Sequence, residues 1–108
     1  MTAVFEVLAE ERRRAILDLL RQSECSVGEL AGRLGTSQPA VSKHLRVLRE
    51  AGLVMVRTDA QRRLYRLQPG PLRAIDEWLE PYRLLWAASL DALERHLDSM
   101  PNDGGDAP

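Results

Sequence analysis

The clearest hydrophobic pattern in the chain lies in residues 26–53, where two short runs of helical spacing are separated by a turn. The apolar residues of the first run recur at helical intervals and form one stripe: Val27, Leu30, Ala31 and Leu34. Ser26 and Glu29 have the spacing of a capping box at its start. Gly35 suits the left-handed conformation that commonly ends a helix. The pattern therefore predicts a capped helix that ends close to residue 34.

The second run has an apolar stripe opposite a polar face. Ser37 can cap it, and Pro39 is tolerated in the first turn, where no intrahelical donor is needed. The stripe consists of Val41, Leu45 and Leu48. The other face and its flanks carry Gln38, Pro39, Ser42, Lys43, Arg46, Arg49 and Glu50. Short polar groups followed by cations favour a DNA-recognition helix, because its first residues meet base edges and later cations reach phosphates. A solvated helix that packs on a partner protein is the alternative.

After Gly52 the spacing changes from helical to extended. Residues 53–58 and 62–67 are rich in β-branched, aromatic and aliphatic side chains and predict a β-hairpin. Because its tip has neither Asn-Gly nor Asp-Gly, we expect a loop longer than two residues. The second strand is expected to place Tyr65 and Leu67 on one face, and Leu64 and Arg66 on the other. The arginines near the hairpin end, which we expect to contact phosphates or the minor groove, are Arg57, Arg62 and Arg63.

Both ends of the chain have helical spacing. Residues 3–9 and 12–21 predict two helices, with a core contribution from Ile16, Leu17, Leu19 and Leu20. From Pro71 onward a coiled-coil-like seam follows: Leu72, Ile75, Leu79, Tyr82, Trp86, Leu90, Leu93 and Leu97. Pro81 lacks a donor and clashes with the preceding turn, so we expect a short helix ending near Glu80 and a longer one from Pro81 to Asp98.

A domain of about 100 residues cannot hide so long an apolar stripe within itself, so the stripe is expected to form a dimer interface or to line a ligand groove. The expected dimer residues are Val4, Phe5, Leu8, Tyr82, Trp86, Leu90, Leu93 and Leu97. The predicted fold is mainly α-helical with a small β-hairpin wing, a dimeric winged helix-turn-helix. We expect one domain over residues 1–100, including terminal dimerisation helices, and a disordered tail over 101–108, which has no apolar anchor.

The distribution of charge supports DNA binding more than the total charge does. The whole chain has a net charge of −1. Residues 33–66 contain eight basic and two acidic side chains, a local charge of +6, so the remainder carries −7. A basic face on an acidic body is typical of a module that presents one side to DNA.

Composition adds several limits. The 108 residues fit one domain, and the single cysteine fits a reducing cytoplasm. We expect no signal peptide and no membrane span, because the N-terminus is amphipathic and the apolar runs are short. Catalysis is not expected either, because the chain lacks a glycine-rich phosphate loop, a nucleophile elbow and a Cys–His–acid set.

Over residues 3–97 the chain resembles the ArsR/SmtB family of small bacterial winged-helix repressors. The resemblance rests on Leu8-Ala9, RRAIL (13–17), SQPAVSKHL (37–45), VLREAGLV (47–54) and YRL (65–67). It implies a homodimeric repressor that binds operator DNA near its own promoter and is released by a signal. The expected DNA contacts are Ser37, Gln38, Pro39, Ser42, Lys43, His44, Arg46, Arg57, Arg62 and Arg63.

The chain departs from the metal-sensing members of that family. Their Cys-Val-Cys pair is replaced by Ser26 and Gly28, and the only cysteine, Cys25, cannot form a soft-metal site alone. Their second site uses Asp and His ligands on the last helix, where this chain has only His96. We therefore expect no metal and no cofactor. The family also contains members without a metal site, often with a Trp-rich last helix like this one.

Three local features have more than one interpretation. Cys25 precedes a helix N-terminus and is either a redox switch or, as we favour, a small apolar residue in a loop. His44 lies between the core stripe and the polar face, where it either donates to a phosphate or fills the helix-turn-helix seam. The run Arg12-Arg13-Arg14 is expected to be a solvated helix face, and the alternative is that one of its arginines reaches a phosphate.

The sequence thus predicts a cytoplasmic, sequence-specific transcriptional regulator, an autoregulating repressor whose partners are duplex operator DNA, a second copy of itself and an unidentified effector. The alternative is a winged-helix adaptor that binds protein or RNA. Salt separates the two, because a DNA reader loses about 0.9 log unit of affinity per log unit of salt for each phosphate neutralised. The sequence does not identify the effector, the operator or the regulated genes.

Overall fold

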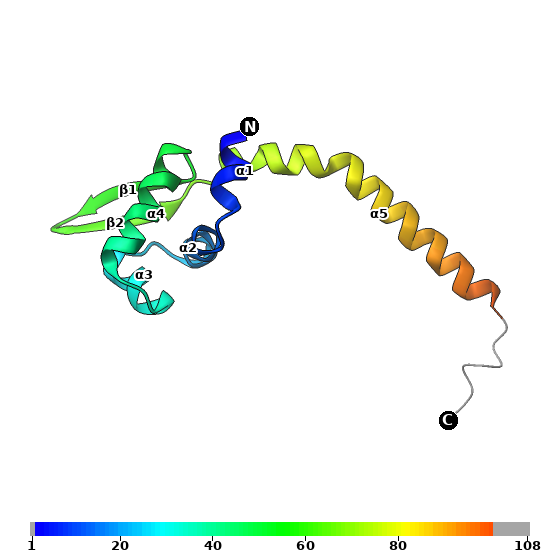
Figure 1. The fold of residues 1–108 in the computed structure, drawn as a ribbon, viewed down its shortest axis with the longest axis horizontal. Helices are drawn as coiled ribbons and strands as arrows, with labels where there is room; N and C mark the ends of the chain where they lie inside the picture. Colours follow the sequence, from blue (N-terminus) through cyan, green and yellow to red (C-terminus); the bar gives the residue numbers. More distant parts are fainter. Residues whose placement is uncertain (1, 101–108) are drawn as a thin grey trace, which may run out of the picture. The chain divides into compact units, whose positions relative to one another are not determined.

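The computed structural model describes residues 2–100, and the chain divides into two units, one ending at Ile75 and the other beginning at Asp76. The predicted disordered tail, residues 101–108, lies outside the described residues. The first unit contains, in order, α1 (Thr2–Leu8), α2 (Glu11–Gln22), α3 (Val27–Leu34), α4 (Gln38–Glu50), β1 (Val54–Asp59), β2 (Arg62–Leu67) and the 3₁₀ turn η1 (Gly70–Leu72). Figure 1 shows the hairpin projecting beside α3 and α4. The predicted helix-turn-helix followed by a wing is confirmed.

The short connection between α1 and α2 is stabilised by side chains from the start of α2. Arg13 Nη1 donates to the Val7 carbonyl at 3.3 Å, and Arg14 Nη1 donates to the Leu8 carbonyl at 2.7 Å. These carbonyls lie at the end of α1, where intrahelical donors are missing. Arg12 and Arg14 are exposed, as predicted for a solvated face, whereas Arg13 is half buried. The prediction did not include the contacts of Arg13 and Arg14 with the end of α1.

The helix-turn-helix has the end caps that its sequence predicts. Glu29 N donates to Ser26 Oγ at 3.2 Å while Ser26 N donates to Glu29 Oε1 at 3.0 Å, which completes the capping box of α3. Gly35 ends α3 with φ = 65°, a left-handed conformation that glycine adopts without steric cost. Ser37 Oγ accepts from Ala40 N at 3.2 Å at the start of α4. These contacts fix where both helices begin and end.

The core of this unit forms where α2, α3 and α4 meet the base of the hairpin. Its most buried side chains are Ile16, Leu30, Leu45, Leu48, Leu53, Val41 and Cys25. The predicted inward stripe of α4 is confirmed, since its three members are at most 1% exposed. Each large aliphatic side chain buried in this way contributes about 1.5–3 kcal/mol of transfer free energy.

A short backbone pairing joins the segment before α3 to the wing. Cys25 N donates to the Tyr65 carbonyl at 3.1 Å, and Tyr65 N donates to the Cys25 carbonyl at 2.8 Å. Cys25 therefore continues the sheet on the free edge of β2. Tyr65 is 7% exposed and belongs to the core. Leu64 is also 7% exposed, so both faces of β2 are covered at this point.

The hairpin tip differs from its prediction. Asp59 pairs with Arg62, so only Ala60 and Gln61 connect the strands, and the expectation of a longer loop is wrong. Ala60 has φ = 57°, a positive value at the first of two central residues, which is what a type II′ turn requires. The strand pairing outweighs the preference for glycine, because the antiparallel ladder runs without interruption from Val54–Leu67 to this tip.

One helix, α5 (Arg73–Ser99), runs into the second unit and is the only element there among the described residues. The predicted break at Pro81 is wrong, because α5 continues through this residue (Figure 1). Proline already has a helical φ and costs one backbone donor, while the neighbouring residues are strong helix formers. Arg83 adds side-chain contacts to this stretch of α5: its guanidinium donates to the Asp76 carbonyl at 2.7 Å and to the Glu80 carboxylate at 2.7 Å.

Candidate nucleic-acid interface

The outer face of α4 presents most of the residues that the sequence assigned to DNA contact. Val41, Leu45 and Leu48 fix the rotation of the helix by their burial, and this rotation turns the polar residues outward. The exposed members of the predicted set on and before α4 are Ser37, Gln38, Pro39, Ser42, Lys43 and Arg46. His44 is only half exposed, which is compatible with either of its two interpretations.

Gln38 lies next to α3 at a glycine. A Cβ atom added to Gly28 would lie 3.4 Å from Gln38 Nε2, at the tight limit of ordinary contact. Sequence reasoning treated Gly28 only as a missing metal ligand. The geometry adds that a side chain at this position would contact the amide of Gln38.

Two of the predicted wing arginines are held in ion pairs. Arg57 Nε and Nη2 donate to the two carboxylate oxygens of Glu24 at 2.7 and 2.8 Å, a bidentate contact. Arg62 Nη2 donates to Glu29 Oε1 at 2.8 Å. Both carboxylates lie outside residues 33–66, so the local charge derived from that stretch overlooks them. Because each pair joins residues 33 positions apart, the sequence pattern alone does not indicate it.

These contacts shift the protonation of the groups involved. The hydrogen bond from Arg57 is the main cause that lowers the pKa of Glu24, and the same bond raises the pKa of Arg57. The pKa of Glu29 is lowered first by its hydrogen bonds within the capping box of Ser26, and further by the charge of Arg62. Both carboxylates are therefore ionised at neutral pH and cancel part of the positive charge of the wing.

Arg63 differs from its two neighbours in the predicted set. Its guanidinium carbon lies 5.9 Å from the centroid of the Tyr65 ring, within cation–π range. Within residues 2–100 no carboxylate forms an ion pair with it. Arg63 thus keeps its full charge available to a ligand.

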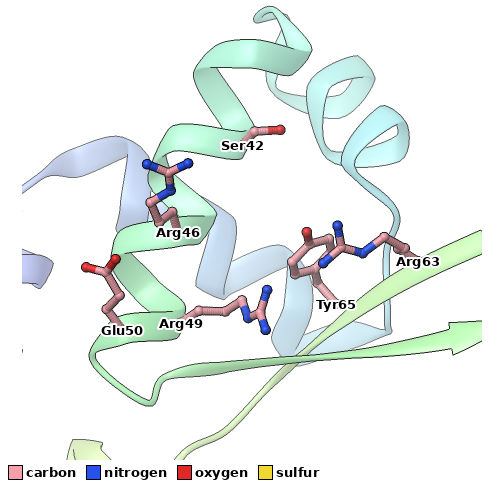
Figure 2. A pocket seen from close by; sticks show the side chains of 6 residues that line it. All are labelled: Ser42, Arg46, Arg49, Glu50, Arg63 and Tyr65. Atoms are coloured by element: carbon pink, nitrogen blue, oxygen red, sulfur yellow. The ribbon is translucent and has the colours of Figure 1, made fainter.

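A groove of about 490 Å³ lies between α4 and β2. It is lined by Ser42, Arg46, Arg49, Glu50, Arg63 and Tyr65 (Figure 2). Sequence reasoning placed Arg49 on a flank of the helix and Tyr65 on a strand face, but assigned neither to the site. Their spacing carried a usable signal, because residues 42, 46, 49 and 50 share one helical face and residues 63 and 65 share one strand face.

The described part of the chain offers no features of a metal site, an accessible thiol or a membrane span. Among residues 2–100, no group of three or more His, Cys, Asp or Glu side chains is arranged to hold a metal ion. Cys25 is fully buried in the core. None of the described helices combines the length and the apolar character needed to cross a membrane.

The predicted dimer residues have different environments in the single chain. Val4 is 7% exposed and already buried, while Phe5 and Leu8 are half exposed. The residues of α5 have large exposed fractions: Tyr82 41%, Trp86 55%, Leu90 67%, Leu93 52% and Leu97 58%. The apolar stripe is therefore a property of α5 rather than of α1.

Residues 10–56 match the family described as bacterial regulatory protein, arsR family. The HTH-type transcriptional regulator Rv2034 of Mycobacterium tuberculosis is 39% identical over 99 residues, which cover 92% of this chain and 90% of that protein. The transcriptional repressor SdpR of Bacillus subtilis is 30% identical over 79 residues, covering 73% of this chain and 88% of that protein.

Solved structures agree with these relatives. The structure of reduced HlyU from Vibrio cholerae has a TM-score of 0.62 and 42% identity, covering 75% of this chain and 85% of that one. HlyU is described as a transcriptional activator, and its sequence is 45% identical over 76 residues, 70% of either chain. The similar proteins thus include a repressor and an activator.

Proposed function

Because the chain belongs to the arsR family of bacterial regulatory proteins and is a DNA-binding transcriptional regulator, we propose that it acts as a homodimeric repressor of its own promoter. An unidentified signal releases it from the operator. Its place of action is the cytoplasm, where promoter DNA is accessible. The alternative of a protein- or RNA-binding adaptor is not favoured, since the named relatives regulate transcription.

The observation that carries the proposal is the outward face of α4. A helix capped by Ser37 and anchored by three nearly inaccessible apolar side chains projects Gln38, Ser42 and Lys43 from one rigid element. Such a helix fits the major groove of DNA, where glutamine can bond adenine through two hydrogen bonds. Gln38 and Ser42 are the proposed base readers, and Lys43 and Arg46 the proposed backbone contacts of the same helix.

The proposed dimer supplies the second half-site. A single winged helix covers few base pairs, whereas two copies on a two-fold axis read a pseudo-palindrome. The apolar stripe of α5 is the proposed main interface, because side chains such as Trp86 and Leu93 are more than half exposed in the single chain. Phe5 and Leu8 contribute from α1.

The proposed signal is not a metal ion. Ser26 caps α3, and Gly28 has no side chain, so neither position offers a thiolate. A small molecule that changes the dimer, or a change at another site, is the proposed kind of signal.

The test is binding of the purified protein to the DNA upstream of its own gene, located by footprinting. Wild-type protein is expected to protect one pseudo-palindromic site and to bind random duplex far more weakly. Gln38→Ala should cost about 1–3 kcal/mol on that site and little on random DNA, because it removes a base contact and no charge. No protected site, or equal losses on both duplexes, contradicts the proposal. Loss of transcription when the gene is deleted would show activation in place of repression.

A further inference from the structure

The arginines of α4 and the wing fall into two groups according to their partners. Arg57 and Arg62 are neutralised by carboxylates, with N–O distances of 2.7 and 2.8 Å. The cations that line the groove between α4 and β2 have no carboxylate partner within residues 2–100, and they are Arg46, Arg49 and Arg63. The free positive charge is thus concentrated in the groove and not at the outer edge of the wing.

Two of these cations, Arg49 and Arg63, extend toward Tyr65. Figure 2 shows Arg49 reaching from α4 and Arg63 reaching from β2 toward Tyr65, while Arg46 and Glu50 point away from it. The Tyr65 ring is almost completely buried, and its hydroxyl has no hydrogen-bond partner among the described residues. Two guanidinium groups and a hydroxyl donor therefore face a common space of the 490 Å³ groove.

This donor set fits a tetrahedral oxyanion. Guanidinium forks pair with phosphate oxygens through two parallel hydrogen bonds, and a hydroxyl can donate to a third oxygen. The rigid position of Tyr65, fixed by its backbone pairing with Cys25, gives the site one immobile donor. The Glu50 carboxylate in the same lining points elsewhere, so it does not occupy the space.

The position of the groove indicates which phosphate would enter it. With α4 in the major groove and the wing directed at the adjacent minor groove, the sugar–phosphate strand that separates the two grooves must pass between helix and wing. The space between α4 and β2 is that passage in this chain.

We infer that Arg49, Arg63 and the Tyr65 hydroxyl together bind one backbone phosphate of the duplex, in the groove between α4 and β2. This inference rests on the proposed function. Arg57 and Arg62 then hold the wing in position through their ion pairs with the helical body, and they are not the principal phosphate ligands.

The test combines arginine variants with single methylphosphonate substitutions, which remove the charge of one phosphate at a time along the footprinted duplex. For the wild-type protein, one position in each half-site is expected to lower affinity by about tenfold, as expected for a charge-assisted contact. Arg63→Ala and Arg49→Ala should each lower affinity for unmodified DNA by about tenfold. Each variant should respond less than the wild type at that position, because one ligand of the phosphate is already missing.

Salt dependence and a matched control complete the design. Arg63→Ala should flatten the slope of log affinity against log salt by about one unit, the value for one phosphate contact. Arg21→Ala removes the same charge from an exposed position of α2 outside the groove and should keep the wild-type slope and the methylphosphonate response. All three side chains are exposed, so unchanged thermal melting will show that the variants fold.

Different outcomes test the phosphate site in the groove and the proposed function separately. If the operator is bound and footprinted but Arg49 and Arg63 couple to different phosphates, or to none, the groove assignment is wrong and the proposed function stands. If inorganic phosphate at millimolar concentration shifts the Tyr65 ring signals without DNA but leaves the affinity for the duplex unchanged, the site belongs to a free anion and the inference is also wrong. Failure to prefer the operator over random DNA would overturn the proposed function itself.

Discussion

Ala60 occupies a backbone conformation that residues with a side chain rarely adopt. Its φ of 57° is required by the two-residue connection between Asp59 and Arg62. The left-handed region costs a non-glycine residue about 1–2 kcal/mol, because Cβ approaches the following carbonyl oxygen. This cost is tolerated because the connection lets the strand pairing continue to the tip.

Ala60→Gly should raise the free energy of unfolding by about 0.5–1 kcal/mol, because relief of this strain exceeds the added entropy of the unfolded chain. Urea denaturation followed by circular dichroism measures the change. Gln61→Gly is the matched control. The φ angle of Gln61 is not positive, so glycine relieves no strain there and this variant should be as stable as the wild type or less stable. Equal effects of the two glycines would show that Ala60 is not strained.

At the level of single residues, sequence reasoning was successful where an interaction is local. The capping box of Ser26 and the left-handed Gly35 follow from spacing and from glycine chemistry, and both are present. The pair formed by Arg57 and Glu24 could not be read in this way, because 33 residues separate its members. For the groove residues Arg49 and Tyr65, spacing indicated the face of each element but not that the two faces meet, because their proximity depends on how the wing packs on α4.

The wing is an element whose position depends on contacts at both of its strands. Arg57 in β1 reaches Glu24 before α3, and Arg62 in β2 reaches the capping residue Glu29. The backbone pairing of Cys25 with Tyr65 fixes the base of the hairpin. Exposed ion pairs contribute little stability on average, but a bidentate pair restricts direction as well as distance.

The pair between Arg57 and Glu24 predicts how the wing responds to acid. Because the pKa of Glu24 is lowered, the contribution of the pair is complete above the ordinary value of 4.5 and is lost as the pH falls through the lowered pKa. The Arg57 Nε–H resonance should therefore shift with a midpoint below pH 4.5. Glu24→Gln should abolish this transition. A midpoint at or above the ordinary value would show that the pair does not form in solution.

The elements themselves were largely predictable from hydrophobic spacing, with α5 as the main exception. A proline inside a helical pattern usually marks a boundary, and Pro81 was interpreted in this way. The helix nevertheless continues, and Arg83 donates to groups of Asp76 and Glu80 in the turns around Pro81. A rule based on the proline alone does not include side-chain contacts of this kind.

At the scale of the whole molecule, the single chain leaves a large apolar surface on α5. Trp86, Leu90, Leu93 and Leu97 are between 52% and 67% exposed. A contiguous apolar stripe of this kind is unusual on a soluble monomer and is typical of an interface. The case for α1 as part of the interface is weaker than the case for α5, because Val4 is already buried within the chain.

Leu93→Glu should convert the protein to a monomer and reduce operator affinity strongly, although α4 is unchanged. The substitution would bury an unpaired carboxylate in the proposed interface, at a cost of several kcal/mol. Analytical ultracentrifugation measures the oligomeric state.

Ala88→Glu is the matched control, since it adds the same charge on the opposite side of α5 and should leave the dimer intact. A dimeric Leu93→Glu protein with normal operator binding would assign the stripe to another partner.

The burial of Cys25 makes its rate of alkylation a measure of local opening in the protein. It is the single thiol of the chain, it is 0% exposed, and its backbone is paired on both sides with Tyr65. A thiol reagent reaches it only in molecules where this part of the structure has opened, so the rate of alkylation counts those openings. Since Tyr65 also lines the groove, a ligand bound in the groove is expected to slow the opening at Cys25. The alkylation rate of Cys25 would thus report how often the core opens next to the proposed DNA-facing groove.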